Sequence, residues 1–466
     1  MPLKQFTTDF QELTKHQYLR FDEKFWFTTK NLATYDYALL KDIFYLLNGN
    51  SYTEFYTEEK TDIPYVRIGD LSFKHNIDDK NLIYLDESCE INEDKKLRKD
   101  DLILATIGAT IGKINLAREF EGGTFSNNTI LLRLKDKEKH NPYFYEKLFQ
   151  SNLLQKYIWG VVSQKAQPNL QSYDLKNVKI PLVAKSIQDQ IVAQIEPIEK
   201  KIKELKSQIT PPQEIINKVF AREFGFDLEK FEELKKIKNY YLDLFSFGNN
   251  RDIRQSVKFH RKAGVFVNTQ LKKITNKKIK DFISEPIVLG KGVSPKNYDE
   301  NGDYYYISMA NIKNWQFESE DSKLVSKEYS DKNKNKTVAK DDILIARSGE
   351  GTIGKVALIE DENLQGIFAD FTMRIRLQNY NPLFAYYYFR TEYFQYLVEI
   401  NKKGLGNNTN IFPSQIQEFP MIDISPKSQQ KIVDEIKTEL DKQKEMKKKI
   451  EIQRNKIDEI IGKAIS

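Results

Sequence analysis

The chain has 466 residues, of which 40% are hydrophobic and 30% are charged, a composition typical of a globular protein with two or three domains. No run of about 18 apolar residues offers a membrane span, and the single cysteine, Cys89, excludes an intramolecular disulfide framework and a cysteine-based zinc site. The net charge of +6 and the pI near 8.8 are mildly basic, which taken alone is weak evidence for DNA binding.

The N-terminal sequence MPLKQFTTDFQEL has no apolar core behind a basic start. We therefore expect no secretory signal and a cytoplasmic protein. The histidines His16, His75, His140 and His260 show neither metal-ligand nor catalytic-triad spacing. We interpret them as solvated or packing side chains and expect no metal site in this chain.

The chain repeats itself. The sequence KDDLILATIGATIGK at 99–113 matches KDDILIARSGEGTIGK at 340–355, 241 positions further along, with one inserted residue near the glycines. Further matches keep the same order: 40–43 with 279–282, 65–71 with 306–312, 141–144 with 381–384, 169–170 with 410–411 and 178–181 with 417–420. Near the two starts, 19–20 and 24–25 match 253–254 and 258–259, although Asp22 has become Ser256. This colinear series predicts a duplication.

The first half begins with short alternating or apolar runs bounded by Gly, Asn and Asp, which predict a β-rich region. A helix is predicted over 142–157, with Asn141 as its N-cap and Pro142 in its first turn. A longer helix follows, whose apolar residues have the 4-3 spacing of a coiled-coil seam: Ile191, Ile195, Ile198, Ile202, Leu205 and Ile209. Thr210-Pro211-Pro212 interrupts this helix, and 213–220 is predicted to resume it. Residues 220–250 form a Lys/Glu-rich connection with room for a further helix.

The second half has the same plan, with a helix predicted over 382–398 and a long helix after it. The apolar stripe of that long helix consists of Ile432, Ile436, Leu440, Ile450, Ile457 and Ile461, and Gln443 and Lys447 interrupt the seam. A small β domain cannot bury such stripes alone. The two long helices are therefore predicted to pair with each other or with partner helices.

Two motifs resemble catalytic sites but lack essential parts. Residues 349–355 follow an apolar strand and nearly spell the phosphate-binding G-x-x-x-x-G-K-[ST], but Val356 stands where a hydroxyl would hold magnesium. We interpret this segment, and its shorter copy at 108–113, as a tight glycine turn between strands. Asn141-Pro142-Tyr143 and Asn381-Pro382-Leu383 lack the second proline of an adenine-methyltransferase loop. No glycine-rich loop for S-adenosylmethionine accompanies them, so we expect no catalytic centre.

The order of these features in duplicate resembles the specificity subunits of type I restriction-modification enzymes. In the first half, 180–182 lead to a glutamine-containing turn and the long helix at 188–192; 419–421 and 429–433 repeat this arrangement. The Lys-Asp-Asp strands, their glycine turns and the approach of 404–411 to the last strand complete the resemblance. It covers nearly the whole chain.

The resemblance implies an α+β fold. Two β-rich target recognition domains, related by duplication, would be separated by two long helices that form an antiparallel coiled coil. The expected boundaries are 1–185 for the first recognition domain, 186–225 for the first spacer helix, 226–426 for the connecting segment and second recognition domain, and 427–466 for the second spacer helix.

The resemblance further implies a non-catalytic subunit that recognises a bipartite target in double-stranded DNA. The coiled coil would set the unread gap. Two modification subunits, which bind S-adenosylmethionine and methylate adenine at N6, would dock on the helices, and restriction (motor-nuclease) subunits would join with ATP and magnesium. No cofactor is expected in this chain, and no membrane partner.

The candidate DNA contacts are positions where the two halves diverge within the shared framework. Arg67 becomes Ser308, and Thr106-Ile107-Gly108 becomes Arg347-Ser348-Gly349. Arginine can fork to guanine, and Asn or Gln to adenine. With the polar loops of both halves, the candidates are Arg67, Thr106, Thr110, Lys113, Gln164, Lys165, Gln167, Asn169, Ser308, Asn311, Arg347, Ser348, Lys355, Lys402, Lys403, Asn407, Asn408 and Asn410.

Three alternatives remain open. The same architecture serves type IIB-like methyltransferase-nuclease assemblies, which differ in their partner genes. A coiled-coil scaffold without sequence specificity would show sequence-blind DNA binding or none. A free-standing enzyme would need the cofactor loop that is missing from this sequence.

Overall fold

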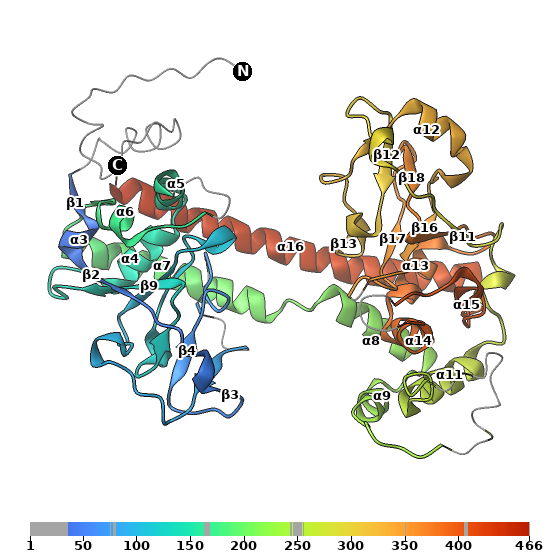
Figure 1. Cartoon of the computed structure of the whole chain (residues 1–466), viewed down its shortest axis with the longest axis horizontal. Coiled ribbons are helices and arrows are strands. Elements are labelled where there is room, and N and C mark those ends of the chain that lie inside the picture. The colour runs from blue at the N-terminus through green and yellow to red at the C-terminus, as the bar shows by residue number, and fades with distance from the viewer. Residues whose placement is uncertain are drawn as a thin grey trace. The chain divides into compact units, whose positions relative to one another are not determined.

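The computed structural model describes residues 36–74, 76–77, 81–162, 168–242, 245, 254, 256–349, 351–404 and 409–465 (Figure 1). The sequence matches at 19–20, 22, 24–25 and 253 lie outside these residues. The chain forms two compact units: unit 1 consists of Met1–Gln208 with Met446–Ser466, and unit 2 of Ile209–Glu445. Among the described residues, no helix is both long and apolar enough to cross a membrane.

Unit 1 contains two four-stranded sheets. The first is antiparallel with the order β2-β9-β6-β7, and the second has the order β3-β5-β4-β8, in which β4 and β8 run parallel. The strands are β2 Phe44–Asn48, β3 Tyr56–Thr57, β4 Pro64–Val66, β5 Ile83–Leu85, β6 Leu102–Ala105, β7 Ile114–Leu116, β8 Thr124–Phe125 and β9 Thr129–Leu134. Separately, β1 Tyr37–Leu39 pairs antiparallel with β10 Lys179–Pro181.

The central strand β6 is buried on both faces because it lies between two cores. Leu102 and Leu104 pack against the helices, whereas Ile103 and Ala105 pack toward the second sheet. Side chains alternate between the faces of a strand, so a continuous apolar run requires cover on both sides. This explains why the segment after Lys-Asp-Asp has no polar alternation.

Unit 2 repeats this arrangement. Its antiparallel sheet has the order β11-β19-β16-β17, and a second sheet has the order β15-β12-β18, in which β12 and β18 run parallel as β4 and β8 do. The strands are β11 Val288–Leu289, β12 Tyr304–Ile307, β13 Ile312–Lys313, β14 Gln316–Phe317, β15 Leu324–Val325, β16 Ile343–Ala346, β17 Val356–Leu358, β18 Gly366–Phe368 and β19 Thr372–Ile375. Ala346 pairs with Thr372 as Ala105 pairs with Thr129, so the duplication extends to the pairing register.

The helix that follows each sheet is broken, which corrects the single helices predicted over 142–157 and 382–398. Unit 1 has α4 Pro142–Gln150 and α5 Asn152–Val161, and unit 2 has α13 Pro382–Arg390 and α14 Glu392–Asn401. At each break a hydroxyl side chain caps the next helix: Ser151 accepts from the Leu154 N–H, and Thr391 from the Phe394 N–H. The predicted N-caps are confirmed, since Asn141 and Asn381 each accept two backbone N–H groups.

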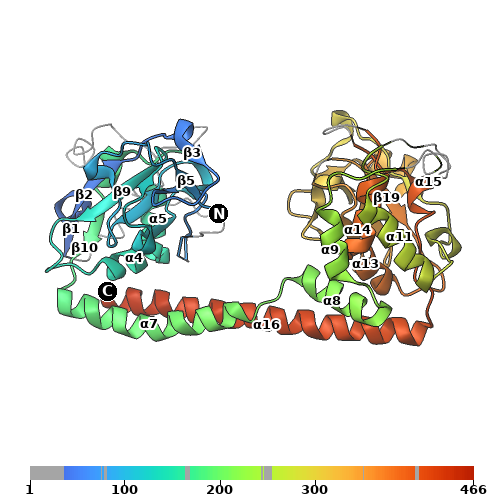
Figure 2. The same cartoon turned by 90° about the horizontal axis from the view of Figure 1, so that it is seen from below.

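The long helices pair antiparallel within each unit, as predicted. In unit 1, α7 (Lys185–Ser207) lies beside the C-terminal end of α16 (Pro426–Ile465), and Ile191 and Ile195 share a core with Ile457 and Ile461 (Figure 2). In unit 2, the Thr210 N–H donates to the Gln443 side chain at 2.9 Å, and Arg222 pairs with Glu435 at 2.6 Å. The chain therefore runs one way from 210 to 222 while its partner segment runs back from 443 to 435.

The predicted interruption and resumption of the first long helix are confirmed. After α7 ends, α8 (Pro212–Phe224) begins, and Gln443 satisfies a backbone donor between them. The seam residues Ile191, Ile195, Ile202, Leu205, Ile432, Ile436, Ile450 and Ile461 are buried, and Ile198, Ile209, Leu440 and Ile457 are half-buried. Gln443, which interrupts the apolar seam of α16, thus accepts a hydrogen bond from the backbone at the break between α7 and α8.

The connection after α8 contains the further helix α9 (Leu228–Lys235), which packs on unit 2. Phe231 lies 5.1 Å from the ring of Tyr393 and the same distance from that of Tyr396. The other helices are α3 Leu40–Ile43, α6 Ser172–Lys176, α11 Lys262–Ile274, α12 Lys327–Lys332 and α15 Pro413–Ile416.

Candidate nucleic-acid interface

In each unit, three chain segments meet at the C-terminal end of one central strand, which is β6 in unit 1 and β16 in unit 2. We call this place the rim. In unit 1 the Thr106 N–H donates to the Asn128 carbonyl at 3.1 Å, and the Leu170 N–H to the Thr106 carbonyl at 2.8 Å. In unit 2 the Arg347 N–H donates to the Phe371 carbonyl at 3.0 Å, and the Ile411 N–H to the Arg347 carbonyl at 2.9 Å. The rims comprise 106–113, 128 and 168–171 in unit 1, and 347–349, 351–355, 371 and 409–412 in unit 2.

The glycine segment of each rim is a hairpin turn between antiparallel strands, as predicted. Gly108 and Gly112 have φ of 62° and 90°, and Gly349 and Gly354 have φ of 87° and 85°, a region that only glycine enters freely. A phosphate-binding loop needs a helix after its glycines, so that the helix N-terminus faces the anion. Here strand β17 follows Lys355, and the resemblance to that motif has no structural basis.

In unit 1 most of the candidates on the rim form hydrogen bonds or β-bridges with the backbone. Thr106 is buried and donates to the Asn128 carbonyl at 2.9 Å, and Thr110 donates to the Ile107 carbonyl at 2.6 Å. Lys113 is half-buried, and Asn169 pairs with Ile107 in a β-bridge. The candidates Gln164, Lys165 and Gln167 lie outside the described residues.

In unit 2 the structure brings four candidates together. The Arg347 guanidinium donates through Nη2 to Asn410 Oδ1 at 3.2 Å, Lys403 and Asn410 exchange backbone hydrogen bonds, and the Ser348 hydroxyl donates to the Thr409 carbonyl at 3.2 Å. The Nε of Arg347 is buried without a hydrogen-bond partner among the described residues. The candidates Asn407 and Asn408 lie outside those residues.

Two exposed aromatic rings flank Arg347. The guanidinium carbon lies 5.9 Å from the ring centre of Phe371 and 5.4 Å from that of Phe412. Phe371 is 45% exposed and Phe412 is 36% exposed. Both distances are within about 6 Å, so the two rings help to hold the guanidinium in place by cation–π attraction.

Sequence reasoning missed four rim residues: Asn128, Gln171, Phe371 and Phe412. Asn128 and Phe371 each precede the strand that pairs with the central strand, and Gln171 and Phe412 each follow the Asn-Leu or Asn-Ile match. Comparing the two halves of the sequence could have identified these positions. The surrounding framework residues match, whereas the amide side chains of unit 1 correspond to phenyl rings in unit 2.

Three candidates, Arg67, Ser308 and Asn311, lie in turns outside the rims. The Asp70 carboxylate accepts from the Arg67 backbone N–H at 2.8 Å, and Asn311 accepts from the Ser308 N–H at 3.0 Å and its hydroxyl at 2.7 Å. The Arg67 guanidinium also pairs with Asp70 at 3.3 Å. These contacts give Arg67, Ser308 and Asn311 a role in the fold.

Lys402 forms an ion pair with a carboxylate that it shares with a second lysine. Its ammonium lies 2.6 Å from Glu399, and Lys258 lies 3.1 Å from the same carboxylate. Burial would raise the pKa of Glu399, but the hydrogen bonds from Lys402 and Lys258 outweigh it and lower that pKa. Lys355 is half-buried beside this group, whereas Lys403 is exposed. The described part of the chain contains no cluster of three metal-ligating side chains.

The two units share one framework of sheets and paired helices and differ in the residues of their rims. A family model described as the type I restriction modification DNA specificity domain matches residues 34–211 and again 271–454. The matches cover more than half of the chain, so the chain belongs to this family. No curated protein matches the sequence.

Three solved structures are similar to this chain at 14% sequence identity. The S subunit of a type I restriction-modification system from M. genitalium covers 93% of this chain and 97% of its own, with a TM-score of 0.42. A chain from a type I system studied for complex assembly and conformational transition covers 92% and 97%, with a TM-score of 0.49. The HsdS subunit from Thermoanaerobacter tengcongensis covers 93% and 97%, with a TM-score of 0.31.

Proposed function

We propose that this chain is the DNA-reading subunit of a type I restriction-modification complex and carries no catalytic centre. Each rim reads one part of a bipartite target in double-stranded DNA. The membership of the DNA specificity family supports this role for the chain as a whole. The rims supply the residues that distinguish one base from another.

The observation that carries the proposal is the chemistry of three equivalent rim positions. Unit 1 has Thr106, Asn128 and Gln171 where unit 2 has Arg347, Phe371 and Phe412. Amide side chains match the adenine edge, and an arginine fork matches guanine. Phenyl rings suit contact with thymine methyl groups. Two domains with one fold and different rims suit two different half-sites.

The proposal extends to domain boundaries and partners. In this proposal the first recognition domain spans 1–185, the connecting segment and second recognition domain span 226–426, and the spacer helices span 186–225 and 427–466. Two modification subunits dock on the helices and bring S-adenosylmethionine. Restriction subunits with ATP and magnesium complete the assembly. The candidate contacts in both polar loops, including the residues outside the described part, belong to this proposal.

A type IIB-like assembly is a second candidate, because the same architecture serves it with different partners. The reading frames next to this one distinguish the two. A separate adenine methyltransferase gene together with a motor-nuclease gene favours type I, whereas a fused methyltransferase-nuclease gene favours the alternative.

The test compares the chain alone with the chain plus its modification subunit. We expect no S-adenosylmethionine binding by calorimetry and no methylation by the chain alone, and methylation at one bipartite sequence with the partner present. The variant Phe412→Gln, which installs the unit 1 residue in unit 2, should change one half-site in sequenced methylation maps. Val265→Gln, at a position 59% exposed on α11, is the matched control and should change neither. Tight cofactor binding by the chain alone, or an unchanged map for Phe412→Gln, would contradict the proposal.

A further inference from the structure

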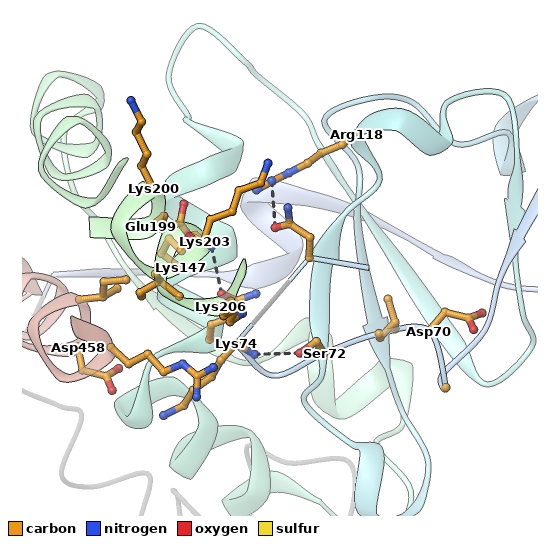
Figure 3. A pocket seen from close by; sticks show the side chains of 17 residues that line it. Asp70, Ser72, Lys74, Arg118, Lys147, Glu199, Lys200, Lys203, Lys206 and Asp458 are labelled. Carbon is orange, nitrogen blue, oxygen red and sulfur yellow. Dashed lines mark hydrogen bonds and ion pairs between the residues drawn. The ribbon is translucent and has the colours of Figure 1, made fainter. Parts of the chain in front are cut away.

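Unit 1 contains a cationic cavity between its β-rich part and its long helices. The cavity has a volume of about 730 Å³ and is lined by residues 69–72, 74, 76 and 118, by α4, by α7 and by the C-terminal part of α16 (Figure 3). Its cationic lining residues are Lys74, Arg118, Lys147, Lys200, Lys203, Lys206 and Arg454. Small-ligand sites in proteins have this size.

The carboxylates in the cavity wall are already engaged. Asp70 pairs with Arg67 at 3.3 Å, Glu199 with Lys147 at 2.5 Å, and Asp458 accepts from the Asn152 side chain at 2.9 Å. In the described part of the chain, no carboxylate lies within ion-pair distance of Lys74 or Lys203. Other lining cations do have such partners: Arg118 and Lys147 lie 2.8 Å and 3.1 Å from Glu146, and Arg454 lies 3.5 Å from Glu451. The excess positive charge among the described residues therefore centres on Lys74 and Lys203.

The cations crowd one another. Figure 3 shows Lys203 and Arg118 pointing toward each other from different elements. Burial and the charge of Arg454 lower the pKa of Lys206 to about 8. Like charges held together in a half-buried space repel each other, and a bound anion with several charges would relieve that repulsion.

The cavity does not belong to the duplicated framework. In the alignment of the two halves, Trp315 corresponds to Lys74, Tyr387 to Lys147 and Glu360 to Arg118. Trp315 packs against the unit 2 core, and the Arg390 guanidinium lies 5.4 Å from its ring centre. The second copy has two aromatic residues and one glutamate at these three positions, so the shared fold does not require the cations of unit 1.

We propose that this cavity binds phosphate groups, carried either by a free polyphosphate ligand or by the DNA backbone. Lysine and arginine side chains are the residues that bind phosphate, through charge and charge-assisted hydrogen bonds. They converge here from five segments of the chain, as a ligand with consecutive phosphates requires. The inference does not depend on the bases that either rim reads.

The test uses the full chain and the double variant Lys74→Gln/Lys203→Gln. Lys201→Gln is the matched control, because Lys201 lies on the same helix, is exposed and is absent from the cavity wall. Tripolyphosphate binding is measured by calorimetry and by the rise in Tm. We expect the double variant to bind at least about tenfold more weakly, since it loses two charged contacts, and the control to bind as the unaltered chain does. Circular dichroism and the ligand-free Tm verify folding, and Lys203→Gln alone provides a milder second variant.

A second measurement distinguishes the two sources of phosphate. If the DNA backbone is the source, tripolyphosphate competes with a non-cognate duplex. The double variant then weakens binding to every sequence and lowers the salt slope by about one unit per lost contact. If a free ligand is the source, duplex binding stays unchanged and tripolyphosphate binds in the presence of DNA. Equal binding of tripolyphosphate and duplex by the variant, the control and the unaltered chain overturns the proposal. A loss confined to assembly with a modification subunit also overturns it and assigns the cavity to a protein partner.

Discussion

Replacing Arg347 by alanine separates base recognition from folding. The fold loses one hydrogen bond, worth about 0.5–1.5 kcal/mol, and two exposed cation–π contacts of about 0.5–1 kcal/mol each. No carboxylate among the described residues pairs with Arg347, so no buried charge is left uncompensated. A bidentate contact to guanine contributes about 1–3 kcal/mol of discrimination. We therefore expect binding to the cognate target to weaken by roughly 5- to 150-fold.

The assay measures affinity for a panel of duplexes that differ from the target by single base pairs, at several salt concentrations. In the Arg347→Ala variant, we expect one position in one half-site to become indifferent to the base, while the other half-site keeps its full discrimination. The salt slope should fall by no more than about one unit, because only one cation is removed. The Tm of the variant reports the folding cost separately.

Two variants serve as controls for Arg347→Ala. Arg347→Lys keeps the charge but not the planar fork, so it should lose discrimination and keep the salt slope. Lys403→Ala removes an exposed cation, so it should weaken binding to all sequences alike and lower the salt slope by about one unit. An Arg347→Ala variant with unchanged discrimination at every position would remove Arg347 from the recognition surface.

Three further predictions concern the other rim, the framework and the helices. Asn128→Ala with Gln171→Ala should relax discrimination in the half-site that Arg347→Ala leaves intact, as the same duplex panel reports. Gly290→Ala should destabilise unit 2 by about 1–3 kcal/mol or more, because its Cβ would lie 2.0 Å from the Phe368 carbonyl oxygen. Gly69→Ala meets nothing within 4 Å and should leave the Tm unchanged, and equal Tm values for the two variants would refute the argument. Adding one heptad to both long helices lengthens each by about 10.5 Å, which corresponds to roughly three base pairs. Methylation mapping should therefore show a wider gap with the same half-sites; changed half-sites with an unchanged gap would contradict this role of the helices.

The parts of the fold that follow a regular spacing could be predicted from the sequence. The 4-3 spacing of apolar residues identified the paired helices, and the repeated Lys-Asp-Asp strands identified the duplicated sheets. The break at Ser151 could not be predicted this way. A serine within a helical pattern is only mildly unfavourable for the helix. Its capping hydrogen bond from the Leu154 N–H depends on the local backbone conformation, which the spacing of apolar residues does not reveal.

The candidate recognition residues were harder to predict because the rim is assembled by strand pairing. Phe371 lies beside Arg347 only because β19 pairs with β16 in one register. Arg67 was chosen because it differs between the halves, yet its partner Asp70 gives it a role in a turn. A difference between repeats indicates freedom to vary, and only the structure shows whether the varying side chain faces solvent.

The ion pairs of the framework and the aromatic residues of the rim follow different physical constraints. Asp101 receives both a 2.9 Å and a 2.7 Å bond from Arg133, and Asp342 receives two bonds of 2.7 Å from Arg376. Arg133 and Asp101 are both buried, so removing either one costs about 3–5 kcal/mol. Arg376 is 35% exposed, so the loss of its bonds to the buried Asp342 costs less. The Phe371 and Phe412 side chains are exposed, and surface substitutions change stability by only about 0.5 kcal/mol. Under the proposed function, each copy can therefore change the DNA sequence that its rim reads without weakening its framework, which is the physical condition for two copies of one fold to recognise two different DNA sequences.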